Sequence, residues 1–159
     1  MATVTLEQRA KIDDLVADAA RLIDDDALEA WVELFVEDSV YRITTRENYD
    51  AGLPISLVYC DHIEMLRDRV ASLRDANIYN IHHDRHLVSG IRVLSLSSGV
   101  CEVHSSYALY QTSSEGRSIL YSVGRYLDKV VFVDDEARFK ERVVVADTAG
   151  IPNLLATPI

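Results

Sequence analysis

The chain has 159 residues, a hydrophobic fraction of 48%, a charged fraction of 26% and a formal net charge of −10. This length and composition are typical of a globular protein with a substantial core, so we expect residues 1–159 to form a single domain. The acidic excess argues against nucleic acid, which needs clustered Lys and Arg, and against an anionic membrane surface. No apolar run approaches the ~20 residues of a membrane span and the N-terminus does not fit a signal peptide, so we expect a cytoplasmic protein.

The first third of the chain carries helical patterns. Thr5 and Gln8 fit a capping box. The stripe that follows has apolar residues at helical spacing, namely Ile12, Leu15, Val16, Ala19, Ala20, Leu22 and Ile23. The acidic run that comes next should end this helix, and Asp25 or Asp26 can cap a second helix that stops near Glu37. The second helix carries the apolar residues Leu28, Trp31, Val32, Leu34 and Phe35.

A mixed stretch follows. Residues 39–45 alternate as a strand does, residues 46–54 have the turn residues of a polar loop, and residues 57–60 indicate a short strand. Asp61 can cap a third helix, whose apolar face is formed by Ile63, Leu66, Val70 and Leu73.

From residue 84 the pattern becomes that of a sheet. Polar hairpin turns separate four β-type runs, at residues 85–97, 100–111, 119–133 and 137–147. Gly90 and Gly124 lie within strand patterns, where glycine usually marks a bulge or bend. Three N-terminal helices before a long, bent antiparallel meander predict an α+β fold. The apolar residues at the C-terminus need a surface to pack against.

The segment His82-His83-Asp84-Arg85-His86 is the first candidate site. In an extended segment, His82, Asp84 and His86 share one face, and His83 and Arg85 share the other. Such an Asp could orient an imidazole for general acid–base chemistry. The alternative, which we favour, is that Asp84 pairs with a nearby Arg or His and that the imidazoles bond to backbone or water.

A metal site has little support in the sequence. His82 and Asp84 with His104 formally give two histidines and a carboxylate, the set of non-haem iron oxygenases, but no other feature supports iron. Cys60 and Cys101 lack C-x-x-C spacing, and we expect two buried, reduced thiols. Phosphate-binding and nucleophile-elbow motifs are also missing from the sequence. We therefore expect no metal on this chain, and nucleophilic catalysis has no specific support in the sequence.

Three segments carry a resemblance to a known family: Arg85-His86-Leu87-Val88-Ser89, the strand from Tyr121 to Asp128, and the closing Leu154-Leu155-Ala156-Thr157-Pro158-Ile159. Together with the order of helices and strands, they resemble the small (beta) subunit of bacterial aromatic-ring-hydroxylating dioxygenases over nearly the whole chain. Gly90 departs from the pattern, since many relatives carry Asn there.

The resemblance implies a cone-shaped α+β fold of the nuclear-transport-factor-2 type, with helices packed on a strongly curved antiparallel or mixed sheet. It implies a structural, non-catalytic role in NADH-dependent aromatic catabolism. The partner would be an alpha subunit that holds a Rieske [2Fe–2S] cluster and a mononuclear iron in an α3β3 hexamer, with self-trimers of this chain and a separate reductase. Segments 76–79 and 48–53 look most like terephthalate, anthranilate or salicylate oxygenases, which suggests a terephthalate-like aromatic carboxylate as substrate.

A free-standing enzyme of the same fold, a dehydratase or isomerase, is the alternative. Its site residues would be Tyr41, His86 and His104, with Asp84 or Asp14 as orienter or base. A ligand-binding module without chemistry is a third possibility. An enclosed pocket with convergent His and Tyr groups would favour the enzyme, whereas a filled cone with an apolar tail buried between subunits would favour the subunit.

Overall fold

The sheet and helices are placed by a computed structural model that describes residues 3–75, 81–148 and 155–159. The helices of the described residues are α1 (Leu6–Asp24), α2 (Leu28–Val32), α3 (Arg46–Asp50) and α4 (Ile63–Asp75). The strands are β1 (Phe35–Thr45), β2 (Val58–Cys60), β3 (His82–Ser97), β4 (Val100–Ser113), β5 (Ser118–Val133) and β6 (Glu136–Ala146). The predicted α+β class is confirmed.

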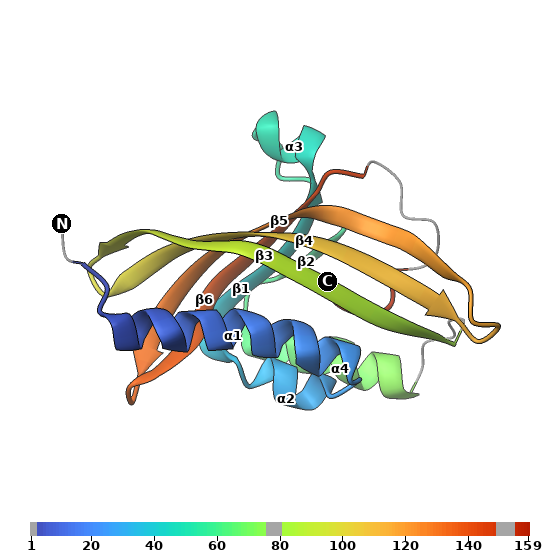
Figure 1. The fold of residues 1–159 in the computed structure, drawn as a ribbon, viewed down its shortest axis with the longest axis horizontal. Helices are drawn as coiled ribbons and strands as arrows, with labels where there is room; N and C mark the ends of the chain where they lie inside the picture. Colours follow the sequence, from blue (N-terminus) through green and yellow to red (C-terminus); the bar gives the residue numbers. More distant parts are fainter. Residues whose placement is uncertain (1–2, 76–80, 149–154) are drawn as a thin grey trace.

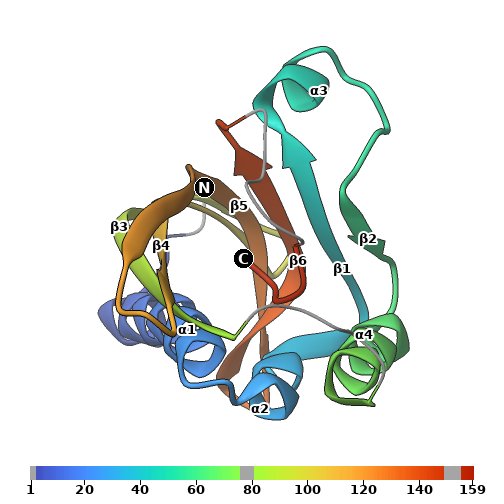
Figure 2. The same ribbon diagram turned by 90° about the vertical axis from the view of Figure 1, so that its right-hand side faces the viewer.

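One mixed sheet with the strand order β2-β1-β6-β5-β4-β3 organises the molecule. Strands β3 to β6 form the predicted antiparallel meander, and β1 adds to it parallel to β6, with β2 antiparallel at the edge. The sheet curves strongly, and α1, α2 and α4 lie along its concave side while α3 projects beyond the end of β1 (Figures 1 and 2). The curved sheet and these three helices enclose the interior of the cone.

Helix α1 begins where the sequence predicts. Thr5 accepts a hydrogen bond from the Gln8 amide at 3.1 Å, and Gln8 Oε1 accepts one from the Thr5 amide at 3.0 Å, which completes the capping box. Six of the seven predicted apolar residues are buried, Leu22 being the exception. The 3.6-residue period therefore identified both the helix and the face that packs on the sheet.

The cap predicted for the second helix is wrong. Ala27 is the N-cap of α2 and provides no side-chain hydrogen bond. Asp26 adopts a left-handed backbone (φ 57°), and both of its carboxylate oxygens accept from Arg74 Nη1 of α4 at 2.8 Å. A salt bridge from the turn between α1 and α2 to α4 therefore uses the carboxylate that local reasoning assigned to a cap.

The predicted end of α2 is also wrong, because strand β1 begins at Phe35. The Phe139 amide donates to the Leu34 carbonyl at 2.9 Å, and Phe35 is the register partner of Phe139. Pairing with β6, 104 positions further along the chain, overrides the helical spacing of the apolar residues. Tertiary contacts of this kind are invisible to a local pattern.

The residues after β1 differ from the predicted polar loop. They begin with the one-turn helix α3, capped by Thr45, whose hydroxyl accepts from the Asn48 amide at 3.3 Å. The third predicted helix, α4, is present, but the side chain that bonds to its first turn is His62, which accepts from the Glu64 amide at 3.3 Å, in place of the predicted Asp61.

The two strand glycines have different roles. Gly90 has a φ of 65° and lies at a register shift between Ser89 and Arg92, so the predicted bulge is confirmed there. Gly124 lies instead where β5 and β6 approach closely, because a Cβ at this position would be 2.1 Å from the Val145 carbonyl oxygen.

An aromatic cluster fills the part of the core between α2 and the sheet. The ring of Trp31 meets those of Phe35 and Tyr41 edge-on, with centroids 5.0 and 5.2 Å apart, and Phe139 packs on Phe35 at 5.1 Å. Such pairs add to the stabilisation that comes from burying large rings. Among the described helices, none is long and apolar enough to cross a membrane.

Candidate functional site

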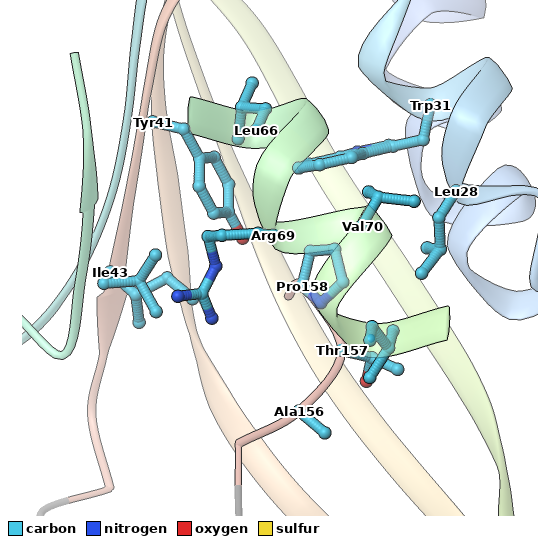
Figure 3. A pocket seen from close by; sticks show the side chains of 12 residues that line it. Leu28, Trp31, Tyr41, Ile43, Leu66, Arg69, Val70, Ala156, Thr157 and Pro158 are labelled. Atoms are coloured by element: carbon cyan, nitrogen blue, oxygen red, sulfur yellow. The ribbon is translucent and has the colours of Figure 1, made fainter. Parts of the chain in front are cut away.

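The interior of the cone is the place to look for a site, because ligand pockets are usually enclosed and mostly apolar. The interior cavity measures about 20 Å³, which is room for about one water molecule. Residues from α2, α4, β1 and β2 line it together with the C-terminal segment (Figure 3). The described residues therefore fill this part of the interior.

The C-terminal segment, residues 155–159, provides much of the filling. Ile159 is 0% exposed and belongs to the hydrophobic core of its own chain. Ala156, Thr157 and Pro158 line the small cavity. The expectation that the apolar tail lies between subunits is thus wrong for Ile159, because the cone of the same chain buries this side chain. Leu154 lies outside the described residues.

Tyr41 holds the end of this segment. Its hydroxyl donates to the Ile159 carbonyl at 3.0 Å and accepts from the Ile159 amide at 3.0 Å. Burial raises the pKa of the Tyr41 hydroxyl well above its usual value. Tyr41 therefore stays protonated at physiological pH and acts as a fixed hydrogen-bonding group.

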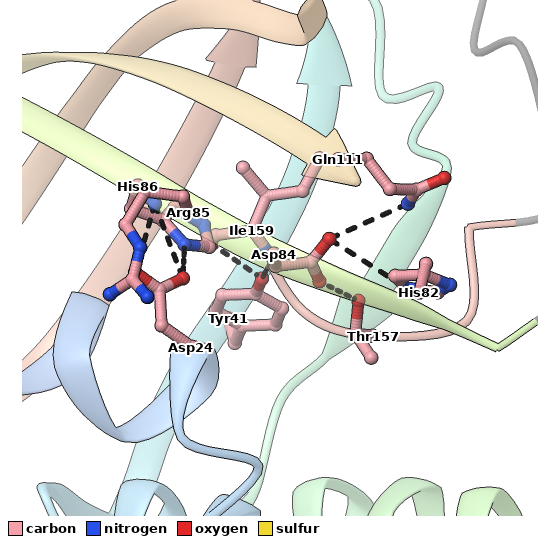
Figure 4. Close-up of polar contacts among 9 residues, drawn as sticks. All are labelled: Asp24, Tyr41, His82, Asp84, Arg85, His86, Gln111, Thr157 and Ile159. Atoms are coloured by element: carbon pink, nitrogen blue, oxygen red, sulfur yellow. Dashed lines mark hydrogen bonds and ion pairs between the residues drawn. The ribbon is translucent and has the colours of Figure 1, made fainter. Parts of the chain in front are cut away.

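Strand β3 presents the histidine segment as predicted. Asp84 and His86 are buried and the His82 side chain is 5% exposed, whereas His83 and Arg85 are exposed on the other face (Figure 4). The period-2 alternation of an extended strand accounts for this division. Residues 76–80, which precede the segment, lie outside the described part of the chain.

His86 is oriented by Asp24 of α1, which the sequence analysis did not identify as a partner. The distance from His86 Nδ1 to Asp24 Oδ1 is 2.6 Å, and the two side chains are 0% and 4% exposed. Because a carboxylate only accepts hydrogen bonds, Nδ1 carries the proton. His86 Nε2 is buried and has no hydrogen-bond partner among the described residues. The orienting acid is therefore not Asp84, as the enzyme hypothesis required.

The Asp24 carboxylate also satisfies the backbone of β3. It accepts from the His86 amide at 2.9 Å, and Arg9 of α1 donates to the Ile91 carbonyl further along the strand. Strand β3 is an edge strand, and unpaired edges invite association with other strands. The two side chains thus let α1 cover the edge, which gives the Asp24–His86 pair a structural task.

Asp84 belongs to a second group of contacts. Its carboxylate accepts from Thr157 Oγ1 at 2.9 Å and from Gln111 Nε2 at 3.4 Å, and His82 Nε2 lies 3.6 Å away. The prediction that Asp84 lies beside a nearby histidine is confirmed, but the prediction that the imidazoles bond to backbone or water is wrong for His86, whose Nδ1 bonds to the Asp24 carboxylate. The Thr157 contact links this carboxylate to the same C-terminal segment that Tyr41 holds (Figure 4).

His104 and Asp14 do not join these residues. The buried residues of β4 are odd-numbered, so His104 points to the outer face, where it lies 3.4 Å from Glu102. Leu109, the register partner of His86, is five residues away along β4, about 17 Å. Asp14 is exposed on α1. The structure therefore does not bring together the residues predicted for a dehydratase or isomerase, because His104 lies apart from Tyr41 and His86. For the same reason it does not form the His82–Asp84–His104 metal site.

The buried tyrosines and cysteines are shifted away from reactivity. Burial raises the pKa of Tyr107 and Tyr121 to about 12, and it also raises the pKa of the Cys60 and Cys101 thiols. A general acid or base works best with a pKa near the working pH, and a reactive cysteine needs a lowered one. These groups therefore behave as parts of the framework.

A buried ion pair was missed by the sequence analysis. Arg142 Nε and Nη2 donate to the Asp128 carboxylate at 2.9 and 2.8 Å, and the guanidinium lies 4.2 Å from the ring centroids of Tyr126 and Phe139. The signal was available, because Asp128 shares its strand face with Tyr126. The two charges are paired with each other, so neither is free for chemistry, and removing one would leave the other as an uncompensated buried charge.

The residues of this chain do not fit the iron centres that the resemblance implies for a partner. A Rieske cluster needs two Cys and two His. Cys60 lies on β2 and Cys101 on β4, with β1, β6 and β5 between them, and both thiols are buried. Within the described residues, no three His, Cys, Asp or Glu side chains come together as potential metal ligands.

Comparisons with known proteins agree with this geometry. The sequence model of the family described as "Ring hydroxylating beta subunit" matches residues 18–153. The anthranilate 1,2-dioxygenase small subunit of Burkholderia cepacia is 46% identical over 137 residues, covering 86% of this chain and 85% of the relative. A terephthalate 1,2-dioxygenase beta subunit of Comamonas sp is 33% identical over 140 residues, 88% of this chain and 91% of the relative.

A solved structure supports the same assignment. A crystal structure from Novosphingobium aromaticivorans DSM 12444, described as the beta subunit of an aromatic-ring-hydroxylating dioxygenase, superposes with a TM-score of 0.86. It is 39% identical and covers 94% of this chain and 95% of its own. The family match, the identities and the shared fold all point the same way, and this chain belongs to the beta subunits of ring-hydroxylating dioxygenases.

Proposed function

We propose that this chain is the structural, non-catalytic beta subunit of an oxygenase component that hydroxylates an aromatic carboxylate. The observation that carries the proposal is the filled cone: with residues 155–159 in place, the interior cavity of about 20 Å³ has no room for an aromatic substrate. Two buried polar groups of the cone bind other parts of the chain: Tyr41 holds Ile159, and Asp84 holds Thr157. A dehydratase or isomerase of this fold would need that space for its substrate.

The alpha subunit would supply the chemistry. We infer that it carries the Rieske cluster and the mononuclear iron, because the donor set of this chain does not fit them. An α3β3 hexamer, with a trimer of this chain at its base and a separate NADH-dependent reductase, is the assembly that we propose. The reduced, buried thiols of Cys60 and Cys101 are consistent with a cytoplasmic location.

The substrate class rests on the relatives. The sequence suggested terephthalate first, but the relative named for anthranilate is more similar, at 46% identity against 33% for terephthalate. We therefore propose an aromatic monocarboxylate such as anthranilate, ahead of a dicarboxylate. The alpha subunit would bind the substrate and distinguish between ring substituents.

Co-expression with an alpha subunit that carries a Rieske motif tests the proposal. We expect the chain alone to turn over no aromatic acid, and the co-purified complex to oxygenate anthranilate faster than terephthalate when the reductase and NADH are added. Native mass spectrometry should give three copies of each subunit, with interfaces of obligate size, above ~2,000 Å². An alpha subunit that is equally active and equally stable without this chain would contradict the proposed role.

A further inference from the structure

Residues 155–159 occupy the cone as a tethered plug. Ile159 is fully buried, and Pro158 lies in the middle of the side chains that line the cavity, near Tyr41, Arg69 and Val70 (Figure 3). The plug is not part of any strand or helix. Two side chains supply the polar contacts described above, Tyr41 to Ile159 and Asp84 to Thr157. A segment held in this way can leave the cone without breaking a sheet or a helix.

The space that the plug fills has the walls of a ligand pocket. Apolar side chains from four elements surround it, namely Leu28, Trp31, Ile43, Val58, Leu66, Val70 and Leu73. The Trp31 and Tyr41 rings stand edge to face 5.2 Å apart on one side. The Pro158 ring is close in size to a six-membered aromatic ring, so a small planar molecule fits the space that Pro158 and Ile159 vacate.

Asp84 loses Thr157 when the plug leaves, but it keeps Gln111 and His82 and does not line the cavity. Two polar groups of the cavity lining would remain, Tyr41 and Arg69. The Tyr41 hydroxyl loses both of its partners. Arg69, on the rim of the same cavity, is an exposed guanidinium that forms no ion pair or hydrogen bond with any described residue. Its neighbours Arg67 and Arg74 on α4 are both paired with carboxylates. An unpaired cation beside a phenolic donor matches a carboxylate, which guanidinium groups bind readily.

We propose that the cone is a binding site for a small aromatic carboxylate, which enters in exchange for residues 155–159. The ring takes the place of Pro158 and Ile159 against Trp31, and the carboxylate binds Arg69 and the Tyr41 hydroxyl. The plug competes with the ligand, so the apparent dissociation constant is the intrinsic one divided by the fraction of chains whose cone is open. The site uses only this chain, so its test is independent of the proposed role in the oxygenase.

Benzoate is a suitable probe, and Trp31, the one tryptophan of the chain, reports on the site directly. We expect benzoate to change Trp31 fluorescence saturably in the full chain, and to bind at least tenfold more tightly to a variant that ends at residue 154. In the shortened chain, Arg69→Gln should weaken the binding of benzoate but leave the affinity for uncharged benzamide unchanged. Arg67→Gln, on the same helix but paired with Glu33, is the matched control.

Equal benzoate affinity in the full and shortened chains would overturn the proposal. A shortened Arg69→Gln chain that binds benzoate as tightly as the shortened chain with Arg69 would also overturn it. If the shortened chain does not unfold cooperatively in urea, the full-length Ile159→Ala variant carries the test. It loosens the plug and keeps the backbone contacts to Tyr41, so its benzoate affinity should rise several-fold. An unchanged or weaker affinity in that variant would count against the exchange of plug and ligand.

Discussion

The contact between Asp24 and His86 is the most informative to perturb, because it separates a structural pair from a catalytic dyad. Replacing Asp24 by alanine removes an acceptor that serves both the His86 imidazole, at 2.6 Å, and the His86 amide, at 2.9 Å. The imidazole is 0% exposed, so water cannot take the place of the carboxylate without a rearrangement of α1. The variant tests whether α1 depends on this contact to hold the edge of β3.

The expected loss of stability follows from these contacts. A hydrogen bond to a charged group contributes about 1.5–3 kcal/mol, and a buried donor that loses its partner costs about 1–3 kcal/mol. Because the terms overlap, we expect Asp24→Ala to lower the free energy of unfolding by about 3 kcal/mol, a large part of the 5–15 kcal/mol of a typical domain. Asp24→Asn keeps one acceptor oxygen and should cost roughly half as much.

Urea denaturation of the purified chain, followed by Trp31 fluorescence, measures these differences. Asp18→Ala is the matched control, since Asp18 is on the same helix but is half-exposed and pairs with Arg21, its one ion-pair partner among the described residues. It should change stability by less than about 0.5 kcal/mol. A double-mutant cycle of Asp24→Ala with His86→Ala should give a coupling energy of about 2 kcal/mol.

Two results would refute the structural interpretation of the pair. One is an Asp24→Ala variant as stable as Asp18→Ala, with a coupling energy near zero. The other comes from the complex with the alpha subunit: His86→Ala should lower the yield of the complex but leave the turnover per iron unchanged. A fully assembled, iron-loaded His86→Ala complex without activity would assign His86 to the chemistry.

Gly124→Ala should destabilise the chain by about 3 kcal/mol or more in the same urea assay, because a Cβ there would lie 2.1 Å from a β6 carbonyl oxygen; a near-neutral variant would mean that β5 and β6 are further apart. Cys60 and Cys101 should not react with a thiol reagent at pH 8 until the chain is unfolded, since burial raises their pKa, and fast reaction of the native chain would contradict their burial. Arg74 lowers the pKa of Glu29 to about 2 by a side-chain hydrogen bond. The depressed pKa means that this contact stabilises the fold above the unfolded pKa of about 4.3 and that the effect fades as the pH falls toward 2. Because both side chains are substantially exposed, we expect less than about 1 kcal/mol, measured as a shallower pH dependence of unfolding in Glu29→Gln, and an unaltered profile would contradict the contact.

Local patterns were sufficient for most of the elements. The capping box placed the start of α1 at the right residue, and the alternation of β3 placed Asp84 and His86 on the inner face. Patterns failed where contacts with a distant segment determined the structure. Phe35 is part of β1, where it pairs with Phe139, and is not part of α2. Asp26 binds Arg74 and does not cap α2. Phe139 and Arg74 are too far away in the sequence for a local pattern to identify them as partners.

The site shows the same division. The sequence identified His86 and Asp84 as inward-facing groups, but the distances between His86, Tyr41 and His104 depend on how the sheet curves and which face each strand presents. His104 was placed with the wrong group because a residue list carries no register. Asp24 was missed because an acid at a helix end has an adequate local explanation, and its second role requires α1 to lie along β3.

The sequence by itself determined the fold class and the family, because the helical and strand periods and the segments that resemble the family are properties of local order along the chain. Only the tertiary structure decided that the cone is closed. Tyr41 and Ile159 are 118 positions apart, and a linear sequence does not show that they meet in space. Burial inside a curved sheet brings Ile159 against Tyr41, and it is this contact that turns a potential pocket into a filled core.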